Sequence, residues 1–214
     1  MTKGVILLSG GLDSLVSLDI ANKTTDIELA LIFNYGQSAY SEEKEAAIKI
    51  AKHYKINYKI VNLPYLKELS QNKFKSNNND NFENVWIPNR NGLFLNIAAT
   101  FCEAMNCEVI IFGANKKEAA QFPDNSQEFV EYCNKTFNYS TLNSVKVCAP
   151  CLQFDKIQII NYAIDNSLPL GLIKSCYNKI EDTGKKHCGR CMSCKLLGEA
   201  ILKSKKPELI KELF

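Results

Sequence analysis

The sequence predicts an α/β fold in which a parallel sheet carries helices on both faces. Short apolar segments rich in aliphatic residues recur along the first 150 residues, and segments of helical length separate them. Strands that alternate with helices form βαβ units, whose strands run parallel. The composition is that of an ordinary globular chain, since 46% of the 214 residues are hydrophobic and 23% are charged.

The first part of the chain supplies three strands and two helices. The expected strands are 5–8, 28–33 and 58–63, and the expected helices are 13–22 and 41–54. Ser41 can cap the second helix, and its apolar side is formed by Ala46, Ala47, Ile50 and Ala51. The polar, Asn-rich segment 71–84 then interrupts the pattern. It is either a surface loop or a lid that orders over a ligand.

After Pro88 the alternation resumes, and near residue 171 the composition changes. The expected helices are 92–105, 126–137 and 155–166, and the expected strands are 108–112 and 145–147. From Gly171 onward Cys, Lys and Gly replace the aliphatic strands. We therefore expect an α/β domain over 1–170 and a small metal-binding extension over 171–214 that ends in a Lys- and Glu-rich helix.

The charge balance favours a small-molecule substrate over a polyanion. With 26 basic and 23 acidic residues the net charge is +3, which gives no electrostatic argument for a nucleic acid or a membrane surface. The sequence has no apolar run near the ~18 residues of a membrane helix. The apolar segment 5–8 is too short for a signal peptide. These features predict a cytoplasmic protein, in which disulfides are rare.

The segment Ser9-Gly10-Gly11-Leu12-Asp13-Ser14 lies between the first expected strand and helix. Two glycines let the backbone approach an anion closely, and a helix N-terminus favours negative charge. The segment therefore has the properties of a phosphate-binding loop, although a tight turn before a capped helix could use the same residues. It lacks the Gly-x-x-x-x-Gly-Lys-Ser/Thr and Gly-x-Gly-x-x-Gly patterns of other nucleotide-binding loops.

Four of the nine cysteines predict a metal site, namely Cys176, Cys188, Cys191 and Cys194. Their four thiolates can satisfy tetrahedral zinc, and a full Cys₄ shell leaves no open position, so we expect one structural zinc ion per chain. An iron–sulfur cluster is the alternative, but the sequence after Cys194 lacks the further Cys and Pro of the bacterial ferredoxin pattern. His187 is adjacent and could compete for a coordination position.

The remaining cysteines have less specific interpretations. Cys148-x-x-Cys151 also has ligand-like spacing, but it follows a strand and contains Pro150, so we interpret the pair as core or wall thiols. A metal site or a redox-active pair is the alternative there. Cys102 and Cys107 flank the end of an apolar helix and are expected to pack in the core. Cys133 has no assigned role.

Taken in order, the motifs resemble the N-type ATP pyrophosphatases and, within them, the QueC family of 7-cyano-7-deazaguanine synthases. The phosphate loop is similar to the pyrophosphate loop of the former. The rest of the likeness is carried by Asn34-Tyr35-Gly36-Gln37, Pro88-Asn89-Arg90-Asn91, Phe122-Pro123-Asp124-Asn125-Ser126 and Ser175-Cys176-Tyr177 with the three later cysteines. The segment 115–124 looks closer to the archaeal type, and Asn125 replaces a Cys common in bacterial members. The resemblance implies the adenine nucleotide alpha hydrolase, or PP-loop, type of α/β fold.

The resemblance also implies a reaction. Family members convert 7-carboxy-7-deazaguanine and ammonia to 7-cyano-7-deazaguanine (preQ0), a precursor in queuosine and archaeosine tRNA modification. Because a carboxylate cannot expel oxide, ATP first adenylates it, and ammonia then gives an amide. A second adenylation permits the nitrile to form. The implied partners are ATP with Mg²⁺, ammonia and the carboxylic acid, without direct contact to nucleic acid or membrane, and members often pair as homodimers.

Three groups of site residues follow from the resemblance. The expected catalytic residues are Asp13, whose position is associated with magnesium, and Lys156 and Arg90, which could neutralise phosphate or carboxylate. The expected ATP-binding residues are Leu8, Ser9, Gly10, Gly11, Leu12, Asp13, Ser14, Asn34, Tyr35, Gly36 and Gln37. The expected substrate-binding residues are Asn91, Phe122, Pro123, Asp124 and Asn125. For several of them an ordinary βα loop, a turn or a solvated charge is the alternative.

Two other functions remain open. A related enzyme could adenylate a different acceptor, such as a tRNA base in thiolation or amidation, and would then want a basic face or an added RNA-binding domain. A non-enzymatic zinc-binding module is the second alternative, and it would not need the phosphate loop.

Overall fold

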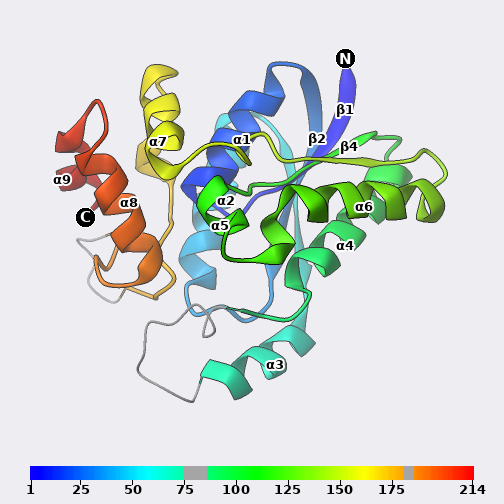
Figure 1. Ribbon diagram of the computed structural model, residues 1–214, viewed down its shortest axis with the longest axis horizontal. Helices are drawn as coiled ribbons and strands as arrows, with labels where there is room; N and C mark the ends of the chain where they lie inside the picture. The colour runs from blue at the N-terminus through cyan, green and yellow to red at the C-terminus, as the bar shows by residue number, and fades with distance from the viewer. Residues whose placement is uncertain (75–85, 181–185) are drawn as a thin grey trace.

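The computed structural model describes residues 1–74, 86–180 and 186–214, with the backbone alone for 70–74. Within these ranges lies a five-stranded sheet in the order β3-β2-β1-β4-β5, whose strands all run parallel (Figure 1). The strands are β1 (Thr2–Leu7), β2 (Thr25–Asn34), β3 (Asn57–Asn62), β4 (Val109–Ile111) and β5 (Lys146–Cys148). The parallel sheet that the sequence predicts is confirmed.

Helices cover both faces of this sheet and bury two apolar cores. One core joins the sheet to α1 (Leu12–Asn22), α2 (Tyr40–His53), α7 (Lys156–Asp165) and α8 (Met192–Leu202). The other core joins it to α4 (Arg90–Ala104) and α6 (Gln127–Ser140). The remaining helices are α3 (Pro64–Phe74), α5 (Lys116–Ala119) and α9 (Ile210–Leu213), with 3₁₀ turns η2 (Pro123–Asn125), η3 (Leu170–Leu172) and η4 (Pro207–Leu209).

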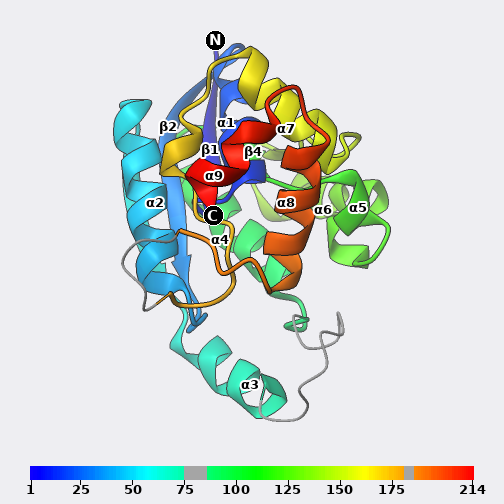
Figure 2. The same ribbon diagram turned by 90° about the vertical axis from the view of Figure 1, so that its left-hand side faces the viewer.

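The C-terminal segment packs onto the first of these cores. Leu197, Ile201 and Leu213 are buried in it together with residues of α1 and α7. Viewed from the side, α8 and α9 lie in front of α1 and the sheet (Figure 2). The last helices therefore add apolar surface to the core of the α/β sheet.

The strand order places a topological switch point at the carboxyl ends of β1 and β4, and we call the region around these two strand ends the crevice. The chain leaves β1 into α1 on one face of the sheet, whereas after β4 it continues to α6 on the other face. In open α/β sheets ligands bind where the connections after two neighbouring strands lead to opposite faces of the sheet. The two loops approach closely, because a Cβ on Gly113 would lie 3.1 Å from the Cα of Ser14.

Several local expectations differ from the structure. Ser41 does not cap α2, because that helix already begins at Tyr40. Its N-cap residue is Ala39, whose side chain makes no capping hydrogen bond. Residues 71–74 of the expected loop 71–84 belong to α3, and residues 75–84 lie outside the described residues. The helix α3 was not predicted, since it has few apolar residues, although Pro64 at its first position suits a helix start. None of the helices in the described part of the chain has the length and apolar character needed to cross a bilayer.

The start of α7 is fixed by a capping box. The Asp155 side chain accepts the backbone N–H of Gln158 at 2.8 Å, and the Gln158 side chain accepts that of Asp155 at 2.8 Å. This reciprocal pair satisfies two N–H groups that the helix itself leaves free. The first helical residue is Lys156, so the box also fixes the backbone of that lysine.

We expect Asp155→Ala to lower the free energy of unfolding by about 0.5–2 kcal/mol, because it removes the cap of α7. Urea denaturation measures the change. Asp155→Ser is the matched control, since serine retains an oxygen that caps a helix nearly as well. Equal losses in the two variants would show that the cap does not stabilise α7.

Candidate active site and metal centre

The loop 9–14 lies in the crevice and is shaped by its own hydrogen bonds. The backbone N–H of Gly11 donates to Ser9 Oγ at 3.3 Å, and Ser14 Oγ donates to the Gly11 carbonyl at 3.0 Å. Gly10 has φ +82°, and a Cβ there would lie 2.6 Å from the Glu43 carbonyl oxygen. No side chain caps α1 at Gly11. Gly11 therefore offers no side chain that would compete with an anion at this helix N-terminus, which is a favourable place for one.

Leu8 and Leu12, which were expected to bind ATP, can contribute only backbone groups to this loop. The side chains of Leu8 and Leu12 are each 1% exposed and belong to the first core. They hold the loop to the sheet, and Leu8 N–H bonds to the Leu31 carbonyl at 2.9 Å.

Asp13 and Lys156 form a close ion pair in the crevice. Lys156 Nζ lies 2.8 Å and 2.6 Å from the two carboxylate oxygens of Asp13. Asn115 Nδ2 adds a hydrogen bond of 3.3 Å to Oδ2 of Asp13. Burial lowers the pKa of Lys156, but the carboxylates of Asp13 and Glu118 outweigh that effect and raise it. The segments that follow β1, β4 and β5 thus meet at one carboxylate.

Arg90 lies on the other side of the crevice with the residues expected to bind substrate. Its guanidinium carbon lies 5.6 Å from the centre of the Tyr35 ring, and its Nε donates to Asn91 Oδ1 at 3.3 Å. Asn91 Nδ2 in turn donates to the Asp124 carbonyl at 3.3 Å. Burial raises the pKa of Asp124, although Arg90 opposes the shift. The Asn125 side chain donates to the Asp124 carboxylate at 2.9 Å.

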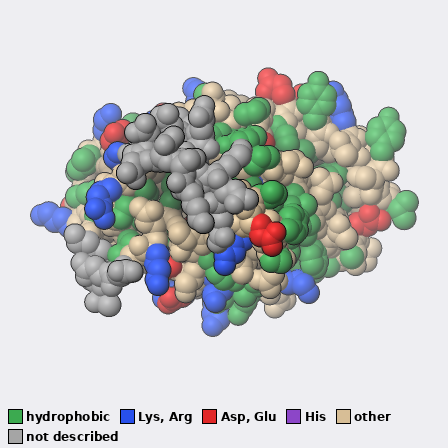
Figure 3. Space-filling model, turned by 90° about the horizontal axis from the view of Figure 1, so that it is seen from below, with side chains coloured by type: hydrophobic (Ala, Val, Ile, Leu, Met, Phe, Trp, Pro, Cys, Tyr) green, Lys and Arg blue, Asp and Glu red, His purple; other side chains and the backbone are tan. Residues whose placement is uncertain are grey.

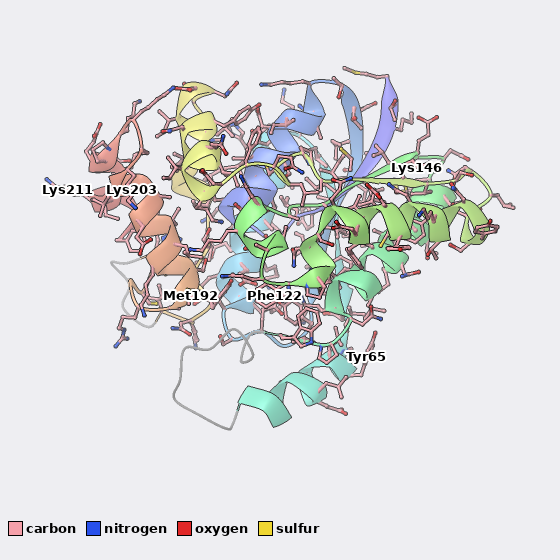
Figure 4. The ribbon with its side chains drawn as sticks, in the orientation of Figure 1. Tyr65, Phe122, Lys146, Met192, Lys203 and Lys211 are labelled. Atoms are coloured by element: carbon pink, nitrogen blue, oxygen red, sulfur yellow. The ribbon has the colours of Figure 1, made fainter. Side chains whose placement is uncertain are left out.

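Phe122 lies next to this group. Its ring stacks on that of Trp86 with centroids 5.9 Å apart. Figure 4 shows it below α5, near the end of the molecule where the strands finish, whereas Lys146 lies well away at the start of β5. Pro123 then begins the turn η2. The five expected substrate residues are therefore neighbours of one another and of Arg90.

The hydrogen bonds of segment 34–37 are made mostly to its own loop and to neighbouring residues of the sheet and α2. Asn34 Nδ2 donates to Asn62 Oδ1 at 2.9 Å, and Gln37 Nε2 donates to the Phe33 carbonyl and to the Glu43 carboxylate, each at 3.1 Å. Gly36 has φ +85°, which favours glycine. Of the four residues, Tyr35 reaches the Arg90 group through its ring.

The four predicted cysteines come together as a cluster. Their sulfur atoms all lie within 4.8 Å of one another, and Cys176–Cys191 and Cys188–Cys194 are 4.0 Å and 3.8 Å apart. These separations approach the edge of about 3.8 Å of a tetrahedron with 2.3 Å metal–sulfur bonds. Burial raises the pKa of Cys188, but N–H groups of Cys191 and Arg190 that donate to its sulfur outweigh this and lower it. The cluster can hold a metal ion as thiolates.

His187 is not a further ligand, because both of its ring nitrogens are engaged. Nε2 accepts the backbone N–H of Ser175 at 3.0 Å, and Nδ1 lies 2.7 Å from the Leu213 carbonyl oxygen. The side chain is 1% exposed. It joins the segment before Cys176 to the C-terminal helix α9, so the expected competition for the metal does not occur in this structure.

The cysteine cluster is tied directly to the phosphate loop. The N–H of Lys174 donates to the Gly10 carbonyl at 2.8 Å, and Ser175 Oγ accepts the N–H of Leu12 at 3.1 Å. The next residue along the chain is Cys176 of the cysteine cluster. Ser175 was quoted only as part of a motif, and its contact joins residues 163 positions apart. The segment that carries the cysteine cluster therefore supports the loop at which α1 begins.

Cys102 and Cys107 were expected to pack in the core, and Cys148 and Cys151 to be core or wall thiols. Cys102, Cys107 and Cys151 are buried, and Cys148 is exposed at the end of β5. All nine cysteines are free thiols in the structure.

Seen from the end where the strands finish, Lys and Arg side chains are spread around the margin of the molecule (Figure 3).

Comparison with known proteins decides the family. The family model described as queuosine biosynthesis protein QueC matches residues 3–205. A 7-cyano-7-deazaguanine synthase of Pelotomaculum thermopropionicum is 40% identical over 90% of this chain and 93% of its own length. One from Methanosarcina mazei is 37% identical over 90% of each chain. This chain belongs to the QueC family. It is an enzyme of the carbon–nitrogen ligase type, and the resemblance that its motifs carry is confirmed.

Solved structures confirm the fold of this QueC family member. An NH3-dependent NAD synthetase from Campylobacter jejuni matches with a TM-score of 0.51 and 18% identity, over 81% of this chain and 67% of that one. A 4-thiouridine synthetase solved with RNA and ATP matches with a TM-score of 0.51 and 19% identity, over 99% and 52%. At these identities the likeness concerns the PP-loop fold alone.

The two loop glycines allow a matched test of the backbone geometry. We expect Gly10→Ala to lower the free energy of unfolding by about 1–3 kcal/mol, because Ala at positive φ is strained and its Cβ would meet the Glu43 carbonyl. Gly11→Ala is the control, since Gly11 has φ −82° and its Cβ would lie 3.4 Å from Ser9 Oγ. Urea denaturation without nucleotide measures both. Equal stability of the two variants would contradict the assigned loop geometry.

Proposed function

We propose that the protein converts 7-carboxy-7-deazaguanine, ammonia and ATP to 7-cyano-7-deazaguanine, a precursor in queuosine or archaeosine tRNA modification. The names of its relatives supply the product. The observation that carries the proposal is the crevice itself. It brings the phosphate loop with Asp13 and Lys156 next to a group that offers Arg90 and the Asp124 carboxylate.

The phosphate loop and its neighbours are suited to bind ATP. Gly10, Gly11, Ser9 and Ser14 form the cradle at the N-terminus of α1, where developing negative charge is stabilised. Lys156 Nζ is held at the edge of this cradle by Asp13. We assign Mg²⁺ to the Asp13 carboxylate, where it would neutralise charge on the leaving pyrophosphate.

The group around Arg90 is suited to bind the acceptor. The Arg90 guanidinium can pair with a carboxylate. The Asp124 carboxylate and the Asn125 amide can accept and donate hydrogen bonds at the edge of a purine-like ring, and Phe122 offers an apolar surface. Adenylation makes the carboxylate oxygen a good leaving group, ammonia gives the amide, and a second adenylation gives the nitrile.

We also propose that the cysteine cluster is a structural zinc site. A Cys₄ shell leaves no open position for water or substrate, and residues 171–214 then form a zinc-tied extension of the domain over 1–170. Support comes from the hydrogen bonds that join Lys174 and Ser175 to the phosphate loop. We place the protein in the cytoplasm, where its free thiols would be kept reduced. Pairing as a homodimer is supported by apolar side chains exposed around α6, such as Tyr139 and Leu142.

We expect the purified protein to release pyrophosphate from ATP only when 7-carboxy-7-deazaguanine and ammonium are present. A coupled pyrophosphate assay together with mass spectrometry of the nitrile measures this. Lys156→Met should lower kcat/KM at least about 100-fold, since it removes a cation from the charge that develops. Unmodified tRNA as sole acceptor is the control. Turnover with tRNA and none with the acid would favour the thiolation or amidation alternative.

The metal assignment has its own test. Metal analysis of the purified chain should give one zinc ion per chain, and Cys191→Ser should remove it, because three thiolates bind zinc less tightly than four. Cys133→Ser is the control, since Cys133 is half-buried in α6 outside the cluster. Iron with visible absorbance would refute a zinc site. If chelation abolished turnover but left folding and ATP binding intact, the structural role would be wrong.

A further inference from the structure

Ser175 reaches the phosphate loop with its side chain, although it lies far along the chain from that loop. Its Oγ accepts the backbone N–H of Leu12 at 3.1 Å, a contact between residues 163 positions apart. A Cβ on Gly11 would lie 3.6 Å from the same oxygen. The proposed function assigns the nucleotide to the loop itself and to Lys156. It therefore leaves one polar side chain at the cradle without a role.

The hydroxyl protons of the two loop serines are already used inside the loop. Ser9 Oγ donates to Ser14 Oγ at 3.1 Å, and Ser14 Oγ donates to the Gly11 carbonyl at 3.0 Å. A hydroxyl has one proton to donate, although it can accept two hydrogen bonds. The Ser175 hydroxyl accepts from Leu12, and within the described part of the chain it has no acceptor for its own proton. Ser175 therefore offers an unused donor next to the first turn of α1.

This donor lies beside the backbone groups that an anion would meet. Ser175 occupies the N–H of Leu12, whereas among the described residues the N–H groups of Asp13 and Ser14 have no acceptor. An anion at a helix N-terminus bonds to such free N–H groups. One hydroxyl can accept an N–H and donate to a phosphate oxygen at the same time. Ser175 can thus contact the anion without giving up its bond to the helix.

The position of Ser175 is fixed on both sides along the chain. Its own N–H donates to His187 Nε2 at 3.0 Å, and the N–H of Lys174 donates to the phosphate loop at 2.8 Å. The residue that follows is Cys176 of the cysteine cluster. Because the backbone is held in this way, the hydroxyl loses little conformational freedom when it pairs with a ligand.

We propose that Ser175 is a further phosphate-binding residue of this site. Its hydroxyl keeps the Leu12 N–H as its donor and gives its own proton to an oxygen of the pyrophosphate part of ATP. The inference rests on the proposed function, because it takes the loop 9–14 as the ATP site. A hydrogen bond to a charged oxygen is stronger than a neutral one, and it stabilises the charge that develops on the leaving pyrophosphate.

A second role for Ser175 predicts a change of opposite sign. If the hydroxyl were only a cap of α1, it would compete with phosphate for the N–H of Leu12, and its removal would tighten the binding of pyrophosphate. If the hydroxyl donates to phosphate, its removal weakens that binding. The direction in which Ser175→Ala changes the affinity for pyrophosphate therefore separates the two roles.

The test is calorimetric titration of the purified full chain with inorganic pyrophosphate and Mg²⁺. We expect Ser175→Ala to weaken binding about 10-fold or more, because it removes a hydrogen bond to a charged group. Ser175→Thr keeps the hydroxyl and should bind within about threefold of the unmodified protein. Ser38→Ala is the matched control, since Ser38 Oγ donates to the Tyr177 carbonyl and so holds the same segment without bonding to the loop. It should change the affinity less than about twofold.

Three results of this titration would overturn the proposal. They are unchanged or tighter binding by Ser175→Ala, equally weak binding by the Ala and Thr variants, and an equal loss in Ser38→Ala. Crystals of the unmodified protein grown with pyrophosphate give a second measurement that needs no variant to fold. Ser175 Oγ should lie about 2.5–3 Å from a phosphate oxygen. An oxygen that has moved out of hydrogen-bond distance would also overturn the proposal.

These outcomes are distinguishable from failure of the proposed function. If the unmodified protein binds neither pyrophosphate nor ATP, the assignment of the phosphate loop is wrong and the role of Ser175 fails with it. If it binds pyrophosphate but shows no turnover that depends on 7-carboxy-7-deazaguanine, the acceptor assignment alone fails. The comparison of the Ser175 variants then still decides the role of this hydroxyl.

Discussion

The contact between Lys156 and Asp13 is the interaction on which the crevice depends. It joins the first turn of α1 to the first turn of α7 across 143 residues of chain. Both side chains are 17% exposed, so each would lose much of its hydration without the other. Removing one partner of such a pair leaves a poorly hydrated charge and costs more than the pair itself contributes. The pair therefore constrains the loop after β1 and the helix after β5 to one relative position.

A second constraint comes from the far end of the chain. Lys174 and Ser175 bond to the backbone of Gly10 and Leu12, and the next residue is a ligand of the cysteine cluster. His187 connects the same segment to Leu213 in α9. The phosphate loop is thus held from the sheet on one side and from the cysteine cluster on the other. This explains how a segment too small to build its own core is held against the loop 9–14.

The parts that could be predicted from sequence are those in which the signal is local. The Ser-Gly-Gly-Leu-Asp-Ser loop needs glycine at Gly10 for its positive φ, and the cysteine spacing is itself the geometry of a metal site. Lys156 could be placed in the crevice because it follows a strand. The position of Glu118 near Lys156 could not be predicted, because the four-residue helix α5 is too short to show a periodic pattern. The roles of Ser175 and His187 depend on contacts between distant segments, which no local pattern contains.

The charges of the crevice suggest how it can hold the two anionic substrates of the proposed reaction at the same time. Among the residues that the structure describes, the carboxylates of Asp13, Glu118 and Asp124 lie there with the cations Lys156 and Arg90. Lys156 is neutralised by Asp13 and Arg90 lies toward Asp124, so neither cation is a free charge in this structure. A phosphate at the loop must compete with Asp13 for Lys156, and an acceptor carboxylate must compete with Asp124 for Arg90.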